Sequence, residues 1–303
     1  MLVSIVIRTL NEQRHLSELL TSIQNQDTEG FDVESVIIDS GSTDDTLNIA
    51  KSFGCRITHI MKEDFTFGRS LNMGCEFADG EILIFVSGHC IPASRVWLKE
   101  LISPIRTGLA HYTYGKQVGR DTTKFSEVKL FEKYFPDYSK VPQEGFFVNN
   151  ANSAIERGVW EKLKFNELVT GLEDMELAKR MVESEVWLTA YVSEAPVYHI
   201  HDETWSQTKN RYEREATALQ KIMPEVHVHI WDALRYFLAG ISVDYSAAVK
   251  KGILHLEWIS IPKFRAAQFI GTYRGNHDHR MLSLEKRERY YYPASKIDRG
   301  DRN

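Results

Sequence analysis

The chain has 303 residues, of which 43% are hydrophobic and 26% charged, so it carries enough apolar material for a sizeable core. Its net charge of −5 gives no positive field that would attract nucleic acid. No apolar run reaches the roughly 18 residues of a membrane span, and the one at the N-terminus is too short for a signal peptide. Cys55, Cys75 and Cys90 match no zinc or CxxC spacing, which indicates a reducing compartment. We therefore expect a cytoplasmic protein, at most peripheral to the inner face of a membrane.

Strand and helix patterns alternate from the N-terminus to about residue 110. The β-branched run over 3–7 is typical of a strand buried on both faces of a parallel sheet, and Asn11 is expected to cap the helix after it. The alternation predicts an α/β fold built from right-handed βαβ units around an open, mostly parallel sheet. Strands are expected over 3–7, 35–38, 56–60, 81–86, 111–115 and 191–198, and helices over 14–26, 46–53, 67–78, 125–135, 157–163 and 173–183.

The pattern becomes wholly helical beyond about residue 205, so we predict a domain over 1–205 and a helical extension over 206–303. In the extension, one apolar stripe comprises Leu234, Phe237, Leu238 and Ile241, and a second helix is expected over 246–258. Basic residues alternate there with aromatic ones, which suits either contact with anionic lipid or helices packed on the domain or on a second subunit. The stretch from about residue 285 has no assignable pattern.

Ligands of open α/β sheets bind beyond the carboxyl ends of the strands, so the polar residues there are candidates for a binding site. These candidates are Thr9, Asn11 and Glu12 after the first strand, Asp39, Ser40 and Gly41 after the second, and Ser87, Gly88 and His89 after the strand over 81–86. The first two groups suit a nucleoside, although Asp39, Ser40 and Asp44 could instead cap the next helix. The absence of GxGxxG and GxxxxGK[ST] argues against a dehydrogenase-type dinucleotide site and a P-loop.

Asp174 is the best candidate for a general base. On the helix over 173–183 it shares one stripe with the apolar residues Leu177, Ala178 and Met181, so it faces the protein. An inward carboxylate is costly unless something pairs with it. Its neighbour Glu173 is explained by the preference of acids for the first turn of a helix, and Glu176 and Arg180 are expected on the exposed face.

Histidines supply a second candidate centre. His199 and His201 form an HxH after the last strand and could bind a divalent metal or a phosphate. The weaker pairs His227 with His229 and His277 with His279 fall in the helical extension.

Together these residues resemble family 2 glycosyltransferases, the inverting enzymes of the GT-A fold, and most of all the bacterial members that build surface polysaccharides. The resemblance covers about residues 1–215. It is carried by VSIVIRTLNE, VIIDSGSTDDT, DFTFGRSLNMGCEFADGEILIFVSGHCIP, FVNNANSAIERGVWEKLKFNE and GLEDMELAKRM, in this order.

The resemblance implies a role for each matching position. The nucleotide sugar would be held by Thr9, Asn11, Glu12, Asp39, Ser40, Gly41, Arg69, Asn72, Ser87 and His89. Asn150, Asn152 and Glu173 would lie on the acceptor side, and Asp174 would deprotonate the acceptor hydroxyl. His199 or His201 matches a histidine that contacts the metal or diphosphate in some members. The acceptor would be a saccharide or a lipid-linked saccharide.

One departure from the family concerns the metal. The family usually has a DxD-type motif whose carboxylates hold Mg²⁺ or Mn²⁺, whereas the matching string here is Ser87-Gly88-His89-Cys90. A divalent cation held by His89, His199 and His201 is one solution. Others are Arg or Lys in place of the metal, a nucleoside monophosphate donor, and a non-catalytic relative that binds sugar nucleotides. A metal-dependent hydrolase is a further alternative, but it would need a set such as HExxH, which is absent.

Overall fold

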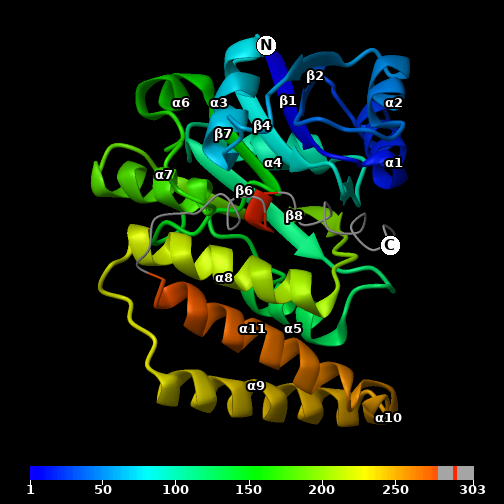
Figure 1. Cartoon of the computed structure of the whole chain (residues 1–303). Coiled ribbons are helices and arrows are strands. Elements are labelled where there is room, and N and C mark those ends of the chain that lie inside the picture. The colour runs from blue at the N-terminus through cyan, green and yellow to red at the C-terminus, as the bar shows by residue number, and fades with distance from the viewer. Residues whose placement is uncertain (279–288, 292–303) are drawn as a thin grey trace. The chain divides into compact units, whose positions relative to one another are not determined.

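The computed structural model describes residues 1–278 and 289–291, which form two compact units (Figure 1). The first unit takes in residues 1–123, 130–168 and 173–201, and the second takes in 124–129, 169–172 and the described part of 202–303. Each unit is described by itself below. No helix in the described part of the chain combines the length and the apolar character needed to cross a membrane.

The first unit is built on one eight-stranded sheet with the order β3-β2-β1-β4-β7-β6-β8-β5. Its first half is parallel and consists of β1 (Leu2–Thr9), β2 (Asp32–Asp39), β3 (Arg56–His59) and β4 (Ile82–Ser87). The second half is mixed and consists of β5 (Cys90–Pro92), β6 (Tyr112–Val118), β7 (Asn152–Glu156) and β8 (Thr189–His199). The expected α/β architecture, an open and mostly parallel sheet flanked by helices, is therefore confirmed.

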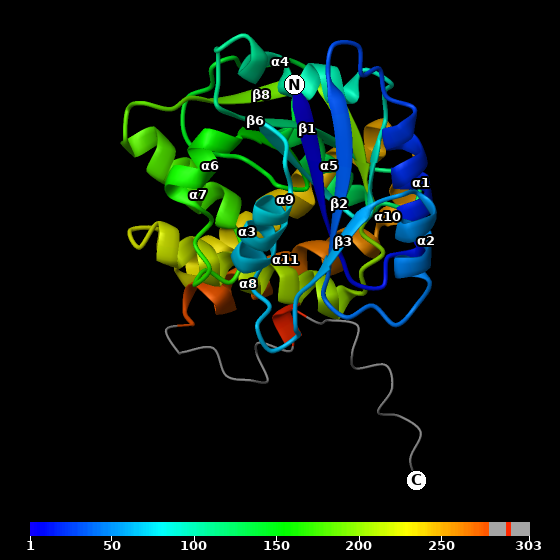
Figure 2. The same ribbon diagram turned by 90° about the horizontal axis from the view of Figure 1, so that it is seen from above.

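Helices cover both faces of this sheet (Figure 2). On one face, α1 (Gln13–Gln24) and α4 (Trp97–Arg106) pack their leucines and isoleucines against the alternate side chains of β1 and β4. On the other face lies α3 (Phe67–Phe77), where a Cβ on Gly74 would stand 2.6 Å from Val6 and 2.4 Å from Ile38. The close approach of α3 to β1 and β2 therefore requires glycine at this position. The remaining helices that contribute to this unit are α2 (Thr46–Ser52), α5 (Phe125–Tyr134), α6 (Arg157–Leu163) and α7 (Glu173–Glu183).

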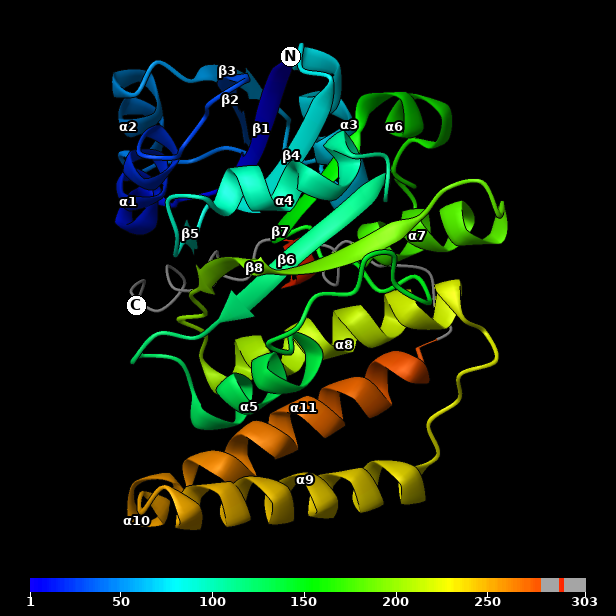
Figure 3. The ribbon, with the colours of Figure 1, turned by 180° about the vertical axis from the view of Figure 1, so that it is seen from behind.

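Two short antiparallel strands complete the sheet and were not expected. β7 runs antiparallel between β4 and β6, and β5 pairs with the end of β8 (Figure 3). The segment over 145–154 was expected to be irregular, because a strand of five residues after an irregular loop leaves no clear alternation of apolar and polar residues. Asn11 does not cap α1 as expected. It lies at φ +57°, and its Oδ1 accepts hydrogen bonds from Thr43 instead.

The second unit consists mainly of α8 (Trp205–Ile222), α9 (Ile230–Lys250), α10 (Leu254–Glu257) and α11 (Ser260–Asn276). The expected helix over 246–258 is wrong, because α9 continues to Lys250 and Gly252 then breaks it at φ +71°. α9 is fixed to α11 by a buried ion pair, in which the guanidinium of Arg265 donates two 2.8 Å hydrogen bonds to Asp244.

α11 packs very closely on α8 through two glycines spaced four apart. A Cβ on Gly271 would lie 2.3 Å from the carbonyl oxygen of Lys209, and one on Gly275 would lie 2.1 Å from that of Glu213. Backbone atoms cannot move aside as a flexible side chain can, so both positions exclude any larger residue.

Replacing Gly275 by Ala should therefore lower the free energy of unfolding by about 1–3 kcal/mol, since the new methyl group forces α11 away from α8. Gly158→Ala is the matched control, because its Cβ would meet only a flexible side-chain oxygen at 3.8 Å. Thermal and urea unfolding of the full chain measure both changes. Equal stability of the two variants would contradict the packing described above.

Candidate active site around the end of strand β1

The carboxylate of Asp39 orders the loop after β2. It is 1% exposed and accepts hydrogen bonds from the hydroxyl of Thr9 at 3.1 Å, from the amides of Gly41 and Ser42 at 2.9 Å each, and from the hydroxyl of Ser42. The hydroxyl of Ser40 donates to the carbonyl oxygen of Thr9 at 3.2 Å. Asp39 does not cap α2, so the capping alternative fails for it. A nucleoside that binds Asp39 must share it with, or displace, one of these rotatable hydroxyls.

The loop after β1 is joined to the loop after β2 by further hydrogen bonds. The amide of Asn11 donates to Ser42 at 2.9 Å, and the amide of Glu12 donates to Thr46 at 2.8 Å. Asp44 accepts from the amide of Thr46, the first residue of α2, but the N-cap of that helix is Asp45, so Asp44 does not occupy the capping position. The two loops therefore form one fixed edge at the carboxyl ends of β1 and β2.

Glu12 also connects this edge to the segment that follows β4, in which Ser87 is the last residue of the strand and pairs with Arg8. Glu12 lies 2.9 Å from Nδ1 of His89. A Cβ on Gly88 would lie only 2.8 Å from Cγ of Glu12, so the glycine makes room for this contact.

Three histidines meet beside Glu12, and they are the three that the sequence singled out. β5 pairs Cys90 with His199, and the amide of Ile200 donates to the carbonyl oxygen of His89, which places the three rings together. The ring centres of His199 and His201 lie 4.0 Å apart, and those of His89 and His199 lie 5.3 Å apart. One potential ligand atom from each residue falls within 4.8 Å of the others.

The orientation of two of these imidazoles is set by second partners. Nδ1 of His89 contacts Glu12, and Nδ1 of His199 lies 2.7 Å from Oε1 of Gln117. When Nδ1 donates to an oxygen, Nε2 carries the lone pair, which is the arrangement of metal-binding histidines held by an outer carboxylate or amide. Gln117 was missed because the strand was expected to end at residue 115, and β6 in fact continues to Val118.

Asp174 is buried, as its place on the helical stripe predicted. Its carboxylate accepts hydrogen bonds from the amides of Asn150 and Met175, each at 2.8 Å. Burial, and next the negative charge of Glu173, raise the pKa of Asp174 to about 7, although the two amides and Arg8 act in the opposite direction. A carboxyl group with such a pKa can take up and release a proton near neutral pH.

Glu173 is buried too, which a preference for the first turn of a helix does not explain. Arg8 of β1 donates to its carboxylate at 3.2 Å, and the guanidinium also stacks over the ring of Phe67. Arg8 was missed as a site residue, and its signal was a charge near the end of an otherwise apolar strand. It compensates one of two adjacent buried acids.

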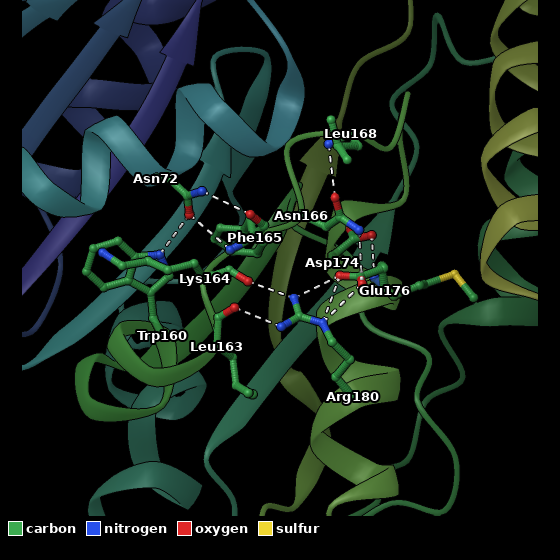
Figure 4. Close-up of polar contacts among 11 residues, drawn as sticks. Asn72, Trp160, Leu163, Lys164, Phe165, Asn166, Leu168, Asp174, Glu176 and Arg180 are labelled. Carbon is green, nitrogen blue, oxygen red and sulfur yellow. Dashed lines mark hydrogen bonds and ion pairs between the residues drawn. The ribbon is translucent and has the colours of Figure 1, made fainter. Parts of the chain in front are cut away.

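Arg69 and Asn72 are engaged with the loop over 163–168. Asn72 uses its full hydrogen-bonding capacity. It accepts from Trp160 and the amide of Phe165 and donates to the carbonyl oxygen of Phe165 (Figure 4). It also donates to Glu167. Arg69 donates to Glu167 at 2.8 Å. These bonds argue against the expected contact of Asn72 with the donor and assign it to holding the loop.

Asn150 and Asn152, both expected on the acceptor side, differ in how their side chains are bonded. Asn152 is fully buried, accepts from Trp97 at 2.8 Å and donates to the carbonyl oxygens of Lys116 and Ala195, so it lines no surface. This burial argues against contact of Asn152 with an acceptor. Asn150, in contrast, has a buried side-chain nitrogen without a partner, next to Asp174.

Glu176 and Arg180 do not form an exposed face of α7. Arg180 pairs with Glu176 at 2.8 Å and donates to the carbonyl oxygens of Leu163 and Lys164, each at 2.7 Å (Figure 4). Periodicity identified a polar face correctly, but it could not show that a loop distant in sequence covers that face. The pair fixes the loop over 163–168 from the α7 side, as Asn72 does from the α3 side.

Arg180→Met should therefore loosen this loop, since two carbonyl groups lose their charged donor at a cost of about 1–3 kcal/mol. Hydrogen exchange of the amides over 163–168 should accelerate, while exchange in β1 and β4 stays slow. Lys179→Met is the matched control on the same helix. Unchanged exchange in Arg180→Met would show that the loop is held without this residue.

The comparisons with known proteins agree with this arrangement. The family described as Glycosyl transferase family 2 matches residues 4–163, just over half of the chain. The O-antigen chain rhamnosyltransferase RfbN of Salmonella typhimurium is 27% identical over 224 residues, which cover 70% of each chain. The GalNAc(5)-diNAcBac-PP-undecaprenol beta-1,3-glucosyltransferase of Campylobacter jejuni is 26% identical over 65% of this chain and 62% of its own length.

Among solved structures, the mannosyltransferase PcManGT of Pyrobaculum calidifontis, in complex with GDP-Man and Mn²⁺, superposes with a TM-score of 0.65 at 16% identity. It covers 92% of this chain and 88% of its own. Glucosyl-3-phosphoglycerate synthase of Mycobacterium tuberculosis gives 0.53 at 19% identity, over 73% of this chain and 79% of its own. The fold is that of GT-A glycosyltransferases. The chain belongs to glycosyl transferase family 2, and its predicted activity as a glycosyltransferase is confirmed at this level.

Proposed function

We propose that this glycosyltransferase moves a sugar from a nucleotide-sugar donor to an acceptor hydroxyl with inversion, in the synthesis of a bacterial surface polysaccharide or glycolipid. The observation that carries the mechanism is the buried carboxyl group of Asp174, whose pKa is raised to about 7. Among family members a single base suffices, because one displacement inverts the anomeric centre. Glycosidases, in contrast, need two carboxylates across the scissile bond.

In the proposed step, ionised Asp174 takes the proton of the acceptor hydroxyl while that oxygen attacks the anomeric carbon of the donor. The new C–O bond forms as the bond from the anomeric carbon to the phosphate oxygen breaks. The nucleotide leaves with the electron pair of that bond. The amides of Asn150 and Met175 fix the position of the carboxylate, so little reorganisation precedes proton transfer.

Donor binding is assigned to the edge formed by the loops after β1 and β2. Thr9 and Asp39 lie on paired positions of neighbouring strands, and they would face the nucleoside together with Ser40 and Gly41. The side-chain nitrogen of Asn150 is suited to a saccharide hydroxyl on the acceptor side.

We assign any divalent cation to His89, His199 and His201. The fit rests on one potential ligand atom from each of three imidazoles, all within 4.8 Å of one another, and on the oxygen partners of Nδ1 in His89 and His199. An imidazole set suits first-row transition ions better than Mg²⁺, so Mn²⁺ is preferred here to Mg²⁺. Bound there, the ion would supply positive charge to the leaving phosphate. There are two alternatives to a cation. Arg or Lys could take the place of the metal, or the donor could be a nucleoside monophosphate sugar.

The names of the two relatives describe transfer of a sugar to an O-antigen chain and to an undecaprenol-linked glycan. We extend this to the chain as a saccharide or lipid-linked saccharide acceptor, reached in the cytoplasm at the inner face of the membrane. A non-catalytic relative that only binds sugar nucleotides is not favoured. Burial of the Asp174 carboxyl group lowers the stability of the fold in its ionised form, and a protein without a reaction to catalyse would gain nothing from it.

Asp174→Asn should lower the rate of transfer about 10²- to 10⁴-fold, since the amide cannot accept the proton. Glu183→Gln, an exposed acid on the same helix, should leave transfer unchanged. Nucleotide release in the presence of cell-derived acceptor and a panel of donors measures both. Wild-type transfer by Asp174→Asn would remove Asp174 from the role of base.

The pH dependence follows from the raised pKa. Transfer should increase with pH along a limb centred near 7, because only ionised Asp174 accepts a proton. Arg8→Met should move this limb upward by about one pH unit, since it removes the positive charge that favours the ionised acid. The contribution of Asp174 to folding stability changes with pH in the opposite direction. A carboxyl group whose pKa is higher in the folded than in the unfolded chain stabilises the fold below pH 4, and this contribution is lost as pH rises to about 7.

The metal assignment is tested without turnover. The full chain should bind Co²⁺ with a visible d–d spectrum that competing Mn²⁺ reduces, and His199→Ala should abolish it. Glu12→Gln should weaken binding about 10- to 100-fold by releasing His89. His255→Ala, an exposed histidine of the second unit, is the control. Equal Co²⁺ binding by wild type and His199→Ala would exclude the site.

A further inference from the structure

The outer side of α9 is apolar and exposed. Trp231, Leu238 and Val249 are separated by seven and eleven residues, which brings them to one side of the helix, and they are 75%, 55% and 59% exposed. Leu234, from the stripe predicted by periodicity, is 45% exposed. Leu234 and Leu238 of the stripe therefore face outward, whereas Ile241 is partly buried and packs against the cluster of Phe125, Ala248 and Ile261.

The inward side of α9 is defined by its buried residues. Ala233, Asp244 and Ala248 are buried, Asp244 through its ion pair with Arg265 and Ala248 against Ile261. Figures 1 and 3 both draw α11 between α8 and α9, so within this unit the opposite side of α9 faces outward. The outer apolar residues are thus additional to a core that is already complete on the inner side.

Exposed apolar residues continue in the chain between α9 and α11. Leu256, Trp258 and Ile259 are 68%, 59% and 47% exposed. The hydroxyl of Tyr245 on α9 donates to the carbonyl oxygen of Trp258 at 2.8 Å, which holds this segment against the end of α9.

Basic residues accompany this segment. Lys250, Lys251 and Lys263 are exposed, and Glu257 is the one acid among residues 249–263. Tryptophan beside leucine, flanked by lysines, is the composition of helices that lie in the headgroup region of a membrane. We call Trp231, Leu238, Val249, Leu256, Trp258 and Ile259 with the three lysines the outer face.

We propose that the outer face docks on an anionic lipid surface. Lysines close to negatively charged headgroups are attracted to them, while the tryptophans and leucines enter the boundary between headgroups and acyl chains. A second copy of the chain fits less well, because lysines are depleted in the buried centre of protein–protein interfaces. The proposal does not depend on the chemistry proposed for the first unit.

The test uses the full chain and sedimentation with vesicles of phosphatidylcholine, with and without phosphatidylglycerol. Binding should require phosphatidylglycerol and weaken as salt is raised. Trp231→Ser with Trp258→Ser should reduce binding about tenfold or more, and Lys250→Glu with Lys251→Glu and Lys263→Glu should remove the dependence on phosphatidylglycerol.

Met61→Ser with Val186→Ser is the matched control, since these apolar residues of the first unit are 62% and 65% exposed. All of these side chains are exposed, so the melting temperature should stay near that of wild type. Binding that is equal for both lipids, or unchanged in the tryptophan variant, would overturn the proposal. A dimer in light scattering that the tryptophan variant dissociates would assign the outer face to a second copy instead.

Discussion

The site depends on five consecutive residues at the carboxyl end of β1, because each part of it is attached to this segment. Arg8 binds Glu173 beside Asp174, Thr9 binds Asp39, and Glu12 contacts His89. β1 itself is buried between β2 and β4, so the segment starts from a rigid strand. The proposed base, the proposed nucleoside edge and the histidine cluster are thereby each connected by a side-chain contact to this one segment.

The cost of this arrangement is concentrated in its buried acids. Asp39 accepts four hydrogen bonds from its own surroundings, so it adds rigidity without an unsatisfied carboxylate oxygen. Asp174 has two amide donors and the adjacent charge of Glu173, which leaves its ionised form poorly stabilised. The same kind of side chain therefore serves to order a loop in one place and to hold a proton near neutral pH in the other.

The sequence predicted most of the fold and part of the site. α6 and α7 have the expected bounds, and the inward direction of Asp174 followed from helical spacing alone. The partners of Asn72, Arg180 and Asn152 could not be predicted, because they lie on loops and strands brought near by folding and leave no periodic signal. In α9 the apolar stripe was identified, yet the exposure of its Leu234 and Leu238 was not, since the buried pair of Asp244 and Arg265 determines which side packs inward. A prediction from hydrophobic periodicity expects apolar residues on the buried face, so it assigns a buried charged residue such as Asp244 to the wrong side.

The contact of Gly88 with Glu12 has a consequence for how the usual carboxylate motif of the family could return to this chain. Any side chain at position 88 would occupy the space of Cγ of Glu12, so an acid introduced there would first displace the residue that orients His89. Positions 12 and 88 are therefore sterically coupled, and each restricts what the other can become.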